Sequence, residues 1–323
     1  MLGFEEFRQE LLEKIPQLMP DKYSNWHVET KRITKMNGER MESFSMMPPK
    51  EEYREGTKIS PVIYIENLYE EYLNKDQSVE VFLSEKAGWY AGHIDYAKEI
   101  EHDGTLDESK LLDPEKIFPV VINAEKNADY LKNIPHREIL DLAVYYKIDV
   151  ESLHGTITIN DGVAAHLGLS EENLYERAMK NMEGKYAPKV IGMCEMLGLP
   201  DMGDEMFKVI TNEEKTNGAN AILMPSVFEQ LAEKVEGDLY VIPSSIHEVL
   251  VLSNDYGDPR ELSKIILQVN QSEAVSPQEW LSDNLYKYNS KDKVLEFAFP
   301  DEVKKKEKPV IVNERKKEEV KVI

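Results

Sequence analysis

The chain has 323 residues, of which 41% are hydrophobic and 31% charged, and its formal net charge at pH 7 is −22. A chain of this length and composition can build a hydrophobic core and is long enough for about two domains. The apolar content excludes full disorder, and glycine and proline, at 16 residues each, are too few for a fibrous repeat.

The acidic residues are spread over both halves of the chain and do not form a tail. A strongly negative surface repels phosphate backbones, so direct binding to nucleic acid is not expected. Two interpretations of the charge remain open. The acidic surface either only keeps the protein soluble, or it presents carboxylates to a basic protein partner.

Three features predict a cytoplasmic protein without membrane contact. No run of about 18 apolar residues is present. The N-terminus carries Glu5 and Glu6 where a secretion signal needs basic residues. The single cysteine, Cys194, cannot form an internal disulfide, which suits a reducing compartment. The sequence makes no prediction of the oligomeric state.

The first hundred residues contain clear local signals. Apolar residues at helical spacing predict an amphipathic helix over 4–18, ended or bent by Pro16. Asn37-Gly38 lies between two alternating runs and predicts a hairpin over 26–47. After Pro61 the pattern indicates a short strand leading into a helix, and 77–100 continues as a second helix.

The middle of the chain reads as strands with short helices. The acidic stretch 101–116 is typical of a loop, and the run 140–148 suits an inner strand. A further strand is predicted over 153–159, followed by a turn at residues 160–162. Ser170 is a good N-cap for the next helix, with Asn173 three residues later.

Strands and helices alternate most clearly in the last third. Helices are predicted over 226–236, capped by Ser226 and ended by Gly237, and from Pro259 onward. A hairpin is expected around residues 290–292. The predicted sheet comprises the segments 207–212, 219–224, 238–243 and 248–253, covered by the helix 226–236.

These elements predict an α+β fold of mixed sheets and hairpins flanked by helices, arranged in two lobes. The N-terminal region is expected to span 1–150 and the C-terminal domain 151–299. Residues 300–323 are charged and interrupted by Pro309, so we expect a flexible tail there.

Several segments occur in the order found in a known protein family. They include ISPVIYIENLYEEYLN at 59–74, NLYERAMKN at 173–181, the long stretch 210–255 and VSPQEWLSDNLYKYN at 275–289. On these segments, region 59–290 resembles a bacterial family, number five-six-eight-eight in the domain-of-unknown-function series, typical of gut clostridia and mobile elements. The resemblance implies no reaction, because that family has none assigned.

No metal or cofactor signature is present in the sequence. The seven histidines form neither H-x-H nor H-E-x-x-H, and no cysteine pair exists. The phosphate-binding loops G-x-x-x-x-G-K-[ST] and G-x-G-x-x-G are also absent. We therefore predict that the protein has neither a metal site nor a bound cofactor.

Two loops carry the weak site candidates. Ser244, Ser245 and His247 lie between two apolar strands, where they could act as nucleophile and base or simply satisfy the backbone of a tight connection. Asn212, Asn217 and Asn220 could line the same sheet edge and bind a ligand, but the pattern strongly favours an ordinary turn with Asn217-Gly218 at positive φ.

Two functions from different classes follow. The first is a non-enzymatic binding or interaction protein with an acidic surface, whose partner is a basic protein. The second is a hydrolase-type enzyme that uses Ser244 or Ser245 with His247. An enzyme of this kind requires a serine hydroxyl within about 3.5 Å of an imidazole nitrogen, beside a pocket, whereas a binding protein needs only an exposed surface.

Overall fold

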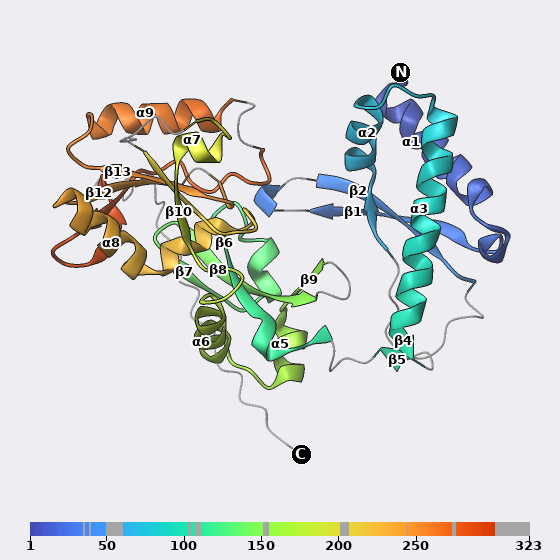
Figure 1. Ribbon diagram of the computed structural model, residues 1–323. Coiled ribbons are helices and arrows are strands. Elements are labelled where there is room, and N and C mark those ends of the chain that lie inside the picture. Colours follow the sequence, from blue (N-terminus) through green and yellow to red (C-terminus); the bar gives the residue numbers. More distant parts are fainter. Residues whose placement is uncertain are drawn as a thin grey trace, which may run out of the picture. The chain divides into compact units, whose positions relative to one another are not determined.

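The computed structural model (Figure 1) describes residues 1–34, 36–38, 40–49, 61–102, 105–106, 111–150, 155–200, 207–243, 245–272 and 276–300. The chain divides into two compact units, one formed by Met1–Gly184 with Ser276–Glu279 and the other by the rest. The boundary predicted near residue 150 falls inside the first unit. The predicted tail lies, from residue 301, outside the described residues. Both units combine helices with antiparallel sheets, which confirms the α+β class.

Helix α1 (Phe4–Leu18) forms where the apolar spacing predicts it. Phe7, Leu11 and Ile15 lie along one face and are fully or almost fully buried. The helix continues to Leu18, past Pro16, because a proline this close to the C-terminal end removes only one backbone hydrogen bond from the helix.

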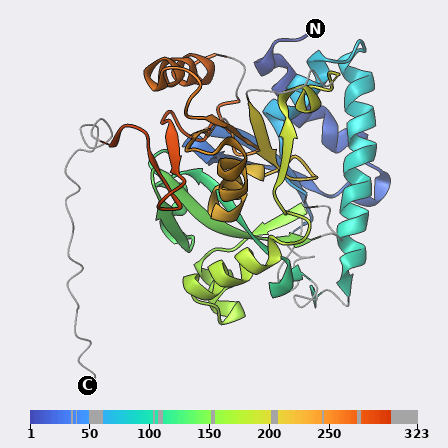
Figure 2. The ribbon, with the colours of Figure 1, turned by 60° about the vertical axis from the view of Figure 1, so that its left-hand side comes forward.

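Helices α2 (Ile65–Leu73) and α3 (Val79–Ile100) pack against α1. The α3 helix runs uninterrupted through its two glycines (Figure 2). The ring of Tyr72 on α2 stacks on Phe7 with centroids 5.1 Å apart, and Tyr69 packs on the same ring. The two tyrosines of α2 therefore lie on the face that packs against the core.

The predicted N-terminal hairpin is confirmed. Strands β1 (His27–Thr34) and β2 (Arg40–Met47) pair antiparallel, and β3 (Ile63–Tyr64) extends this sheet beside β2. Asn37 and Gly38 in the turn both have positive φ, at 59° and 75°, as the Asn-Gly signal requires.

A second sheet of the first unit has the order β6-β8-β7, with β9 also pairing with β8. Its strands are β6 (Ile117–Asn123), β7 (His136–Ile139), β8 (Leu142–Val150) and β9 (Gly155–Thr158). The first five residues of β8 are all buried, so the inner strand predicted over 140–148 is confirmed with a shifted start.

Two helices follow this sheet in the first unit. Helix α5 (Asp161–Leu167) begins after Asn160, whose side chain accepts a hydrogen bond from the Val163 amide. Helix α6 (Glu171–Asn181) begins after Ser170, whose hydroxyl accepts one from the Asn173 amide, as predicted. The short elements of this unit are η1 (Asp21–Tyr23), η2 (Met36–Gly38), β4 (Glu101–His102), β5 (Thr105–Leu106), η4 (Pro114–Lys116) and η5 (Tyr130–Asn133).

The second unit is built on a sheet with the order β10-β11-β13-β12-β14-β15, antiparallel throughout. The strands are β10 (Lys189–Gly192), β11 (Lys208–Thr211), β12 (Leu239–Ile242), β13 (Val249–Ser253), β14 (Tyr286–Asn289) and β15 (Val294–Phe297). Helix α7 (Met193–Met196) follows β10 directly. The predicted strands near 207–212, 238–243 and 248–253 and the predicted hairpin around 290–292 are all confirmed.

The strand predicted over 219–224 is wrong. This segment forms the 3₁₀ helix η7 (Gly218–Leu223), in which every residue is buried. The run follows Asn217, which has a left-handed backbone with φ 55°, and the amides of Asn220 and Met224 bond back to carbonyls three residues earlier. A short, continuous apolar run is compatible with either a strand or a buried helix, so its pattern did not distinguish the two.

Helix α8 (Pro225–Val235) follows η7 directly, and its ends differ from the prediction by one residue. Pro225 takes the first helical position, which favours proline, so Ser226 is not the N-cap. At the other end Glu236, and not Gly237, takes the left-handed conformation with φ 54°. The Gly237 amide then bonds to the Ala232 carbonyl.

Helices α8 and α9 (Pro259–Asn270) lie on opposite faces of the six-stranded sheet, α9 above it and α8 below it in Figure 1. On the α8 face, Phe228 stacks on Tyr288 with centroids 5.7 Å apart. On the α9 face, Ile266 packs with Ile242 and Leu252 in a separate apolar cluster. The sheet thus has two buried faces, which explains its nearly continuous apolar strands.

Candidate functional site

The two loops that carry the sequence candidates meet where β11 ends and the neighbouring strand β13 begins, at one end of these inner strands. The backbone amide of Asn217 donates to Nδ1 of His247 at 3.2 Å. The hydroxyl of Thr211, at the end of β11, donates to the His247 carbonyl at 2.9 Å. The Ala219 amide donates to the Ile246 carbonyl at 3.2 Å. The structure therefore brings the asparagine loop and the His247 loop together.

Within the asparagine loop the side chains serve the turn itself. The Asn212 amide group donates to the Thr216 carbonyl at 2.7 Å, and its carbonyl oxygen accepts from the Thr216 amide at 3.2 Å. Asn217 supplies the left-handed position, and Asn220 is only 2% exposed. Asn212 is buried too, so neither it nor Asn220 presents a side chain to an external ligand.

Ser245 is held by hydrogen bonds within its own turn. Its hydroxyl donates to a carboxylate oxygen of Glu248 at 2.7 Å and accepts from the His247 amide at 3.0 Å. The side chain is buried, with 5% exposure, and its backbone bridges to Trp280. The serine proton points to a carboxylate, and Nδ1 of His247 already accepts a backbone amide. Ser244 lies outside the described residues.

Close backbone approach at Gly218 fixes the two loops. A Cβ placed on Gly218 would lie 2.6 Å from both Cα and Oγ1 of Thr211, and closer still to the carbonyl oxygen of His247. Contacts shorter than 3.0 Å essentially never occur for a real Cβ. The Asn217-Gly218 pair therefore serves close packing as well as a turn.

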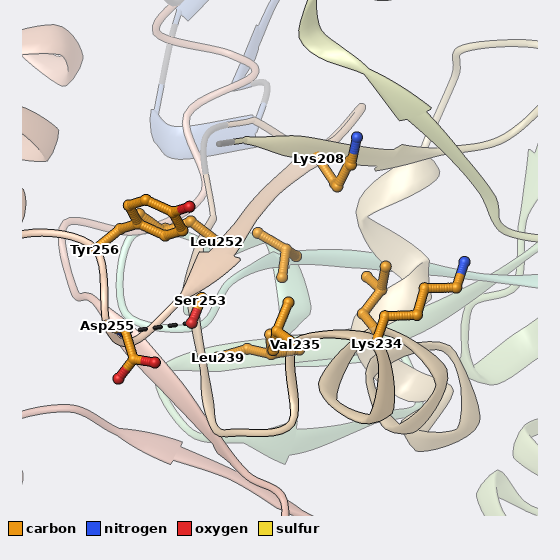
Figure 3. Close-up of a pocket in the computed structure, with 10 residues that line it drawn as sticks. Lys208, Lys234, Val235, Leu239, Leu252, Ser253, Asp255 and Tyr256 are labelled. Carbon is orange, nitrogen blue, oxygen red and sulfur yellow. Dashed lines mark hydrogen bonds between the residues drawn. The ribbon is translucent and has the colours of Figure 1, made fainter. Parts of the chain in front are cut away.

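A pocket of about 540 Å³ opens on the α8 face of the same sheet (Figure 3). Its lining residues are Lys208, Leu231, Lys234, Val235, Leu239, Val251, Leu252, Ser253, Asp255 and Tyr256. Sequence reasoning missed this site, since its residues come from four segments with no shared motif.

Two charged clusters outside the pocket are built for stability. In the first unit, Arg137 on β7 makes a two-pronged hydrogen bond to Glu171 on α6, at 2.8 and 2.9 Å. The buried Tyr146 hydroxyl also donates to Glu171, and the Arg137 guanidinium lies 3.6 Å from the centre of the Tyr175 ring. Burial raises the pKa of Glu171, but the bonds from Arg137 and Tyr146 outweigh it and hold that pKa below 4.5.

In the second unit, Asp238 ties β12 to the β14–β15 hairpin. One carboxylate oxygen pairs with Lys287 at 2.8 Å, and the other accepts from the amide and hydroxyl of Ser290 at 2.9 and 2.8 Å. The bond from Lys287, assisted by those from Ser290, lowers the pKa of Asp238 to about 2. This carboxylate is therefore ionised at neutral pH and links the start of β12 to the β14–β15 hairpin.

Within the described ranges, no group of three or more His, Cys, Asp or Glu side chains is placed to hold a metal ion. None of the helices in the described part of the chain has the length and apolar character needed to cross a bilayer.

The family model described as "Family of unknown function (DUF5688)" matches residues 4–290. The chain belongs to this family. Membership confirms the resemblance and extends it over the N-terminal helix and hairpin, which precede the segments that suggested it. No curated protein and no solved structure matches the chain. The description of the family names no activity.

Proposed function

We propose that this chain is a non-enzymatic binding protein that uses its acidic surface to hold a basic protein partner in the cytoplasm. The observation that carries the proposal is where the acidic residues lie. No Asp or Glu among the described side chains is buried, so the described carboxylates reach solvent in a chain whose net charge is −22. The same surface disfavours direct contact with nucleic acid, and the lone Cys194 suits a reducing compartment.

The distribution of cations supports this proposal. Many lysines and arginines of the described surface already pair with a carboxylate of the same chain. Examples are Arg8 with Glu42, Lys22 with Asp95, Lys75 with Glu71, Lys189 with Glu213 and Lys293 with Glu229. Because such pairs neutralise these cations locally, the carboxylates that outnumber the cations set the sign of the field that an approaching partner meets.

The hydrolase alternative finds less support in the described geometry. The buried Ser245 hydroxyl donates its hydrogen bond to Glu248. In a hydrolase of the proposed kind, the serine hydroxyl donates to an imidazole nitrogen and faces the substrate. His247 holds the asparagine loop through Nδ1 and its carbonyl oxygen. These contacts favour a structural role for the segment 245–248.

Affinity capture tests the proposal. The tagged full-length chain is used to capture partners from its native host at low salt, and each captured protein is then purified and its binding measured. We expect a partner with a basic surface, whose affinity falls at least about tenfold between about 0.05 M and about 0.5 M salt, since screening shortens the reach of exposed charges. His247→Ala should bind equally well and lose no more than about 1–2 kcal/mol of stability.

Two results would contradict the proposal. One is a captured partner whose affinity does not change with salt. The other is a purified chain that turns over an ester, peptide or nucleotide substrate and loses that activity in a folded His247→Ala variant.

A further inference from the structure

The pocket on the α8 face combines an apolar wall with a cationic side. Cross-strand register places Lys208 on β11 directly beside Val251 on β13, so the two side chains share one face of the sheet. Leu231 and Val235, from α8, line the same space. Its volume of about 540 Å³ falls within the range of small-molecule sites.

The two lysines of the pocket are not paired with a carboxylate of the described chain. Within the described part of the chain, neither Lys208 nor Lys234 forms an ion pair, whereas Lys287 and Lys293 elsewhere in the same unit pair with Asp238 and Glu229. Lys215 and Lys291 of the same unit are likewise without an ion pair among the described residues, so the distinguishing feature of Lys208 and Lys234 is that both line one pocket, in a chain with a net charge of −22. Figure 3 shows Lys234 at one side of the pocket, and Asp255 with Tyr256 at the opposite side.

The two sides of the pocket carry opposite charges. An anionic group is attracted to the side of Lys208 and Lys234 and repelled by Asp255. Aliphatic side chains of Leu231, Val235 and Leu239 also line the pocket and favour a hydrocarbon body. A second negative charge on the ligand would meet Asp255, so a single charge fits best.

We propose that this pocket binds a small amphipathic monocarboxylate, with its carboxylate between Lys208 and Lys234 and its hydrocarbon chain against the aliphatic wall. Ser253 and Tyr256 line the pocket on the side of Asp255, away from Lys234. The site is independent of the acidic surface, so failure of either proposal leaves the other standing.

Calorimetric titration of the full-length chain with octanoate, octylamine and acetate tests the site. We expect octanoate to bind, and octylamine and acetate to show no binding over the same concentration range. Octylamine keeps the hydrocarbon chain and reverses the charge, while acetate keeps the charge and lacks the chain. Equal binding of octanoate and octylamine, or no binding of octanoate at millimolar concentration, would overturn the proposal.

Variants then locate the bound ligand. Combining Lys208→Gln with Lys234→Gln should weaken octanoate binding at least about tenfold, as expected for loss of charge-assisted contacts. Val235→Trp should abolish binding by filling the pocket from α8. The matched control is Lys264→Gln on α9, on the other face of the sheet. Lys264 pairs with Glu261 there, so this substitution should not change octanoate binding. If the double variant does not fold, the octanoate affinity of the single variant Lys234→Gln, at an exposed position, provides the test. Unchanged affinity in a folded pocket variant would place the ligand elsewhere.

Discussion

Replacing Gly218 with alanine is expected to destabilise the second unit by about 3 kcal/mol, at the upper end of the range for overpacking. The added methyl would lie 2.6 Å from Cα of Thr211 and against the carbonyl oxygen of His247. Both neighbours are backbone atoms, and the surrounding residues of η7 are buried, so a side-chain rotation cannot relieve the clash. Urea unfolding measures the loss in the free energy of unfolding. Faster amide hydrogen exchange over 207–223 in the variant would show that the destabilisation arises where the two loops meet.

Gly237→Ala is the matched control in the same unit. The nearest atoms to a Cβ at Gly237 are 3.7 and 3.8 Å away, which is ordinary contact. We expect a change within about 0.5 kcal/mol of wild type. If Gly218→Ala proves as stable as this control, the two loops are not held at the observed separation, and the structural role assigned to His247 fails.

Replacing Glu171 with glutamine is expected to destabilise the first unit by about 2 kcal/mol at neutral pH. The change removes the counter-charge of Arg137 and weakens the acceptor of the buried Tyr146 hydroxyl. The estimate lies below that for a fully buried pair, because the side chains of Arg137 and Glu171 remain 27% and 31% exposed. Glu172→Gln, at the next and exposed position of α6, should change stability by less than about 0.5 kcal/mol.

The same variant predicts a pH dependence with a defined sign. The pKa of Glu171 is lower in the folded chain than its ordinary 4.5, so its contribution is fully present above that pH and is lost as pH falls through the folded pKa. The stability difference between wild type and Glu171→Gln should therefore shrink as the pH is lowered from neutral to about 3. A difference that stays constant or grows on acidification would contradict the lowered pKa.

Local sequence signals predicted most elements of the fold. The apolar spacing of Phe7, Leu11 and Ile15 and the Asn37-Gly38 turn act over a few residues, and both appear as predicted. The strand predicted over 219–224 was wrong because residues 218–223 are all buried, which removes the periodicity that separates a helix from a strand. Strands β8 and β9 pair antiparallel on either side of residue 150, so the first unit continues past the boundary expected there.

The candidate site was predictable only in part. The proximity of the Asn217 and His247 loops follows from their positions at the ends of adjacent strands β11 and β13. The partner of the Ser245 hydroxyl was not predictable, because it depends on the turn that brings Glu248 back toward it. The pocket was beyond sequence reasoning, since Lys208 and Lys234 come from a strand and a helix joined only by the fold.

Labelling with a fluorophosphonate probe tests most directly whether the loop between β12 and β13 is structural or catalytic. The probe forms a covalent adduct only with a serine whose hydroxyl is activated by a base, and intact mass measurement detects a single addition. The hydrogen bonds of Ser245 to Glu248 and of His247 to Asn217 predict no adduct on the folded chain. One adduct on Ser244 or Ser245, absent from a folded His247→Ala variant, would contradict the binding function and establish the hydrolase.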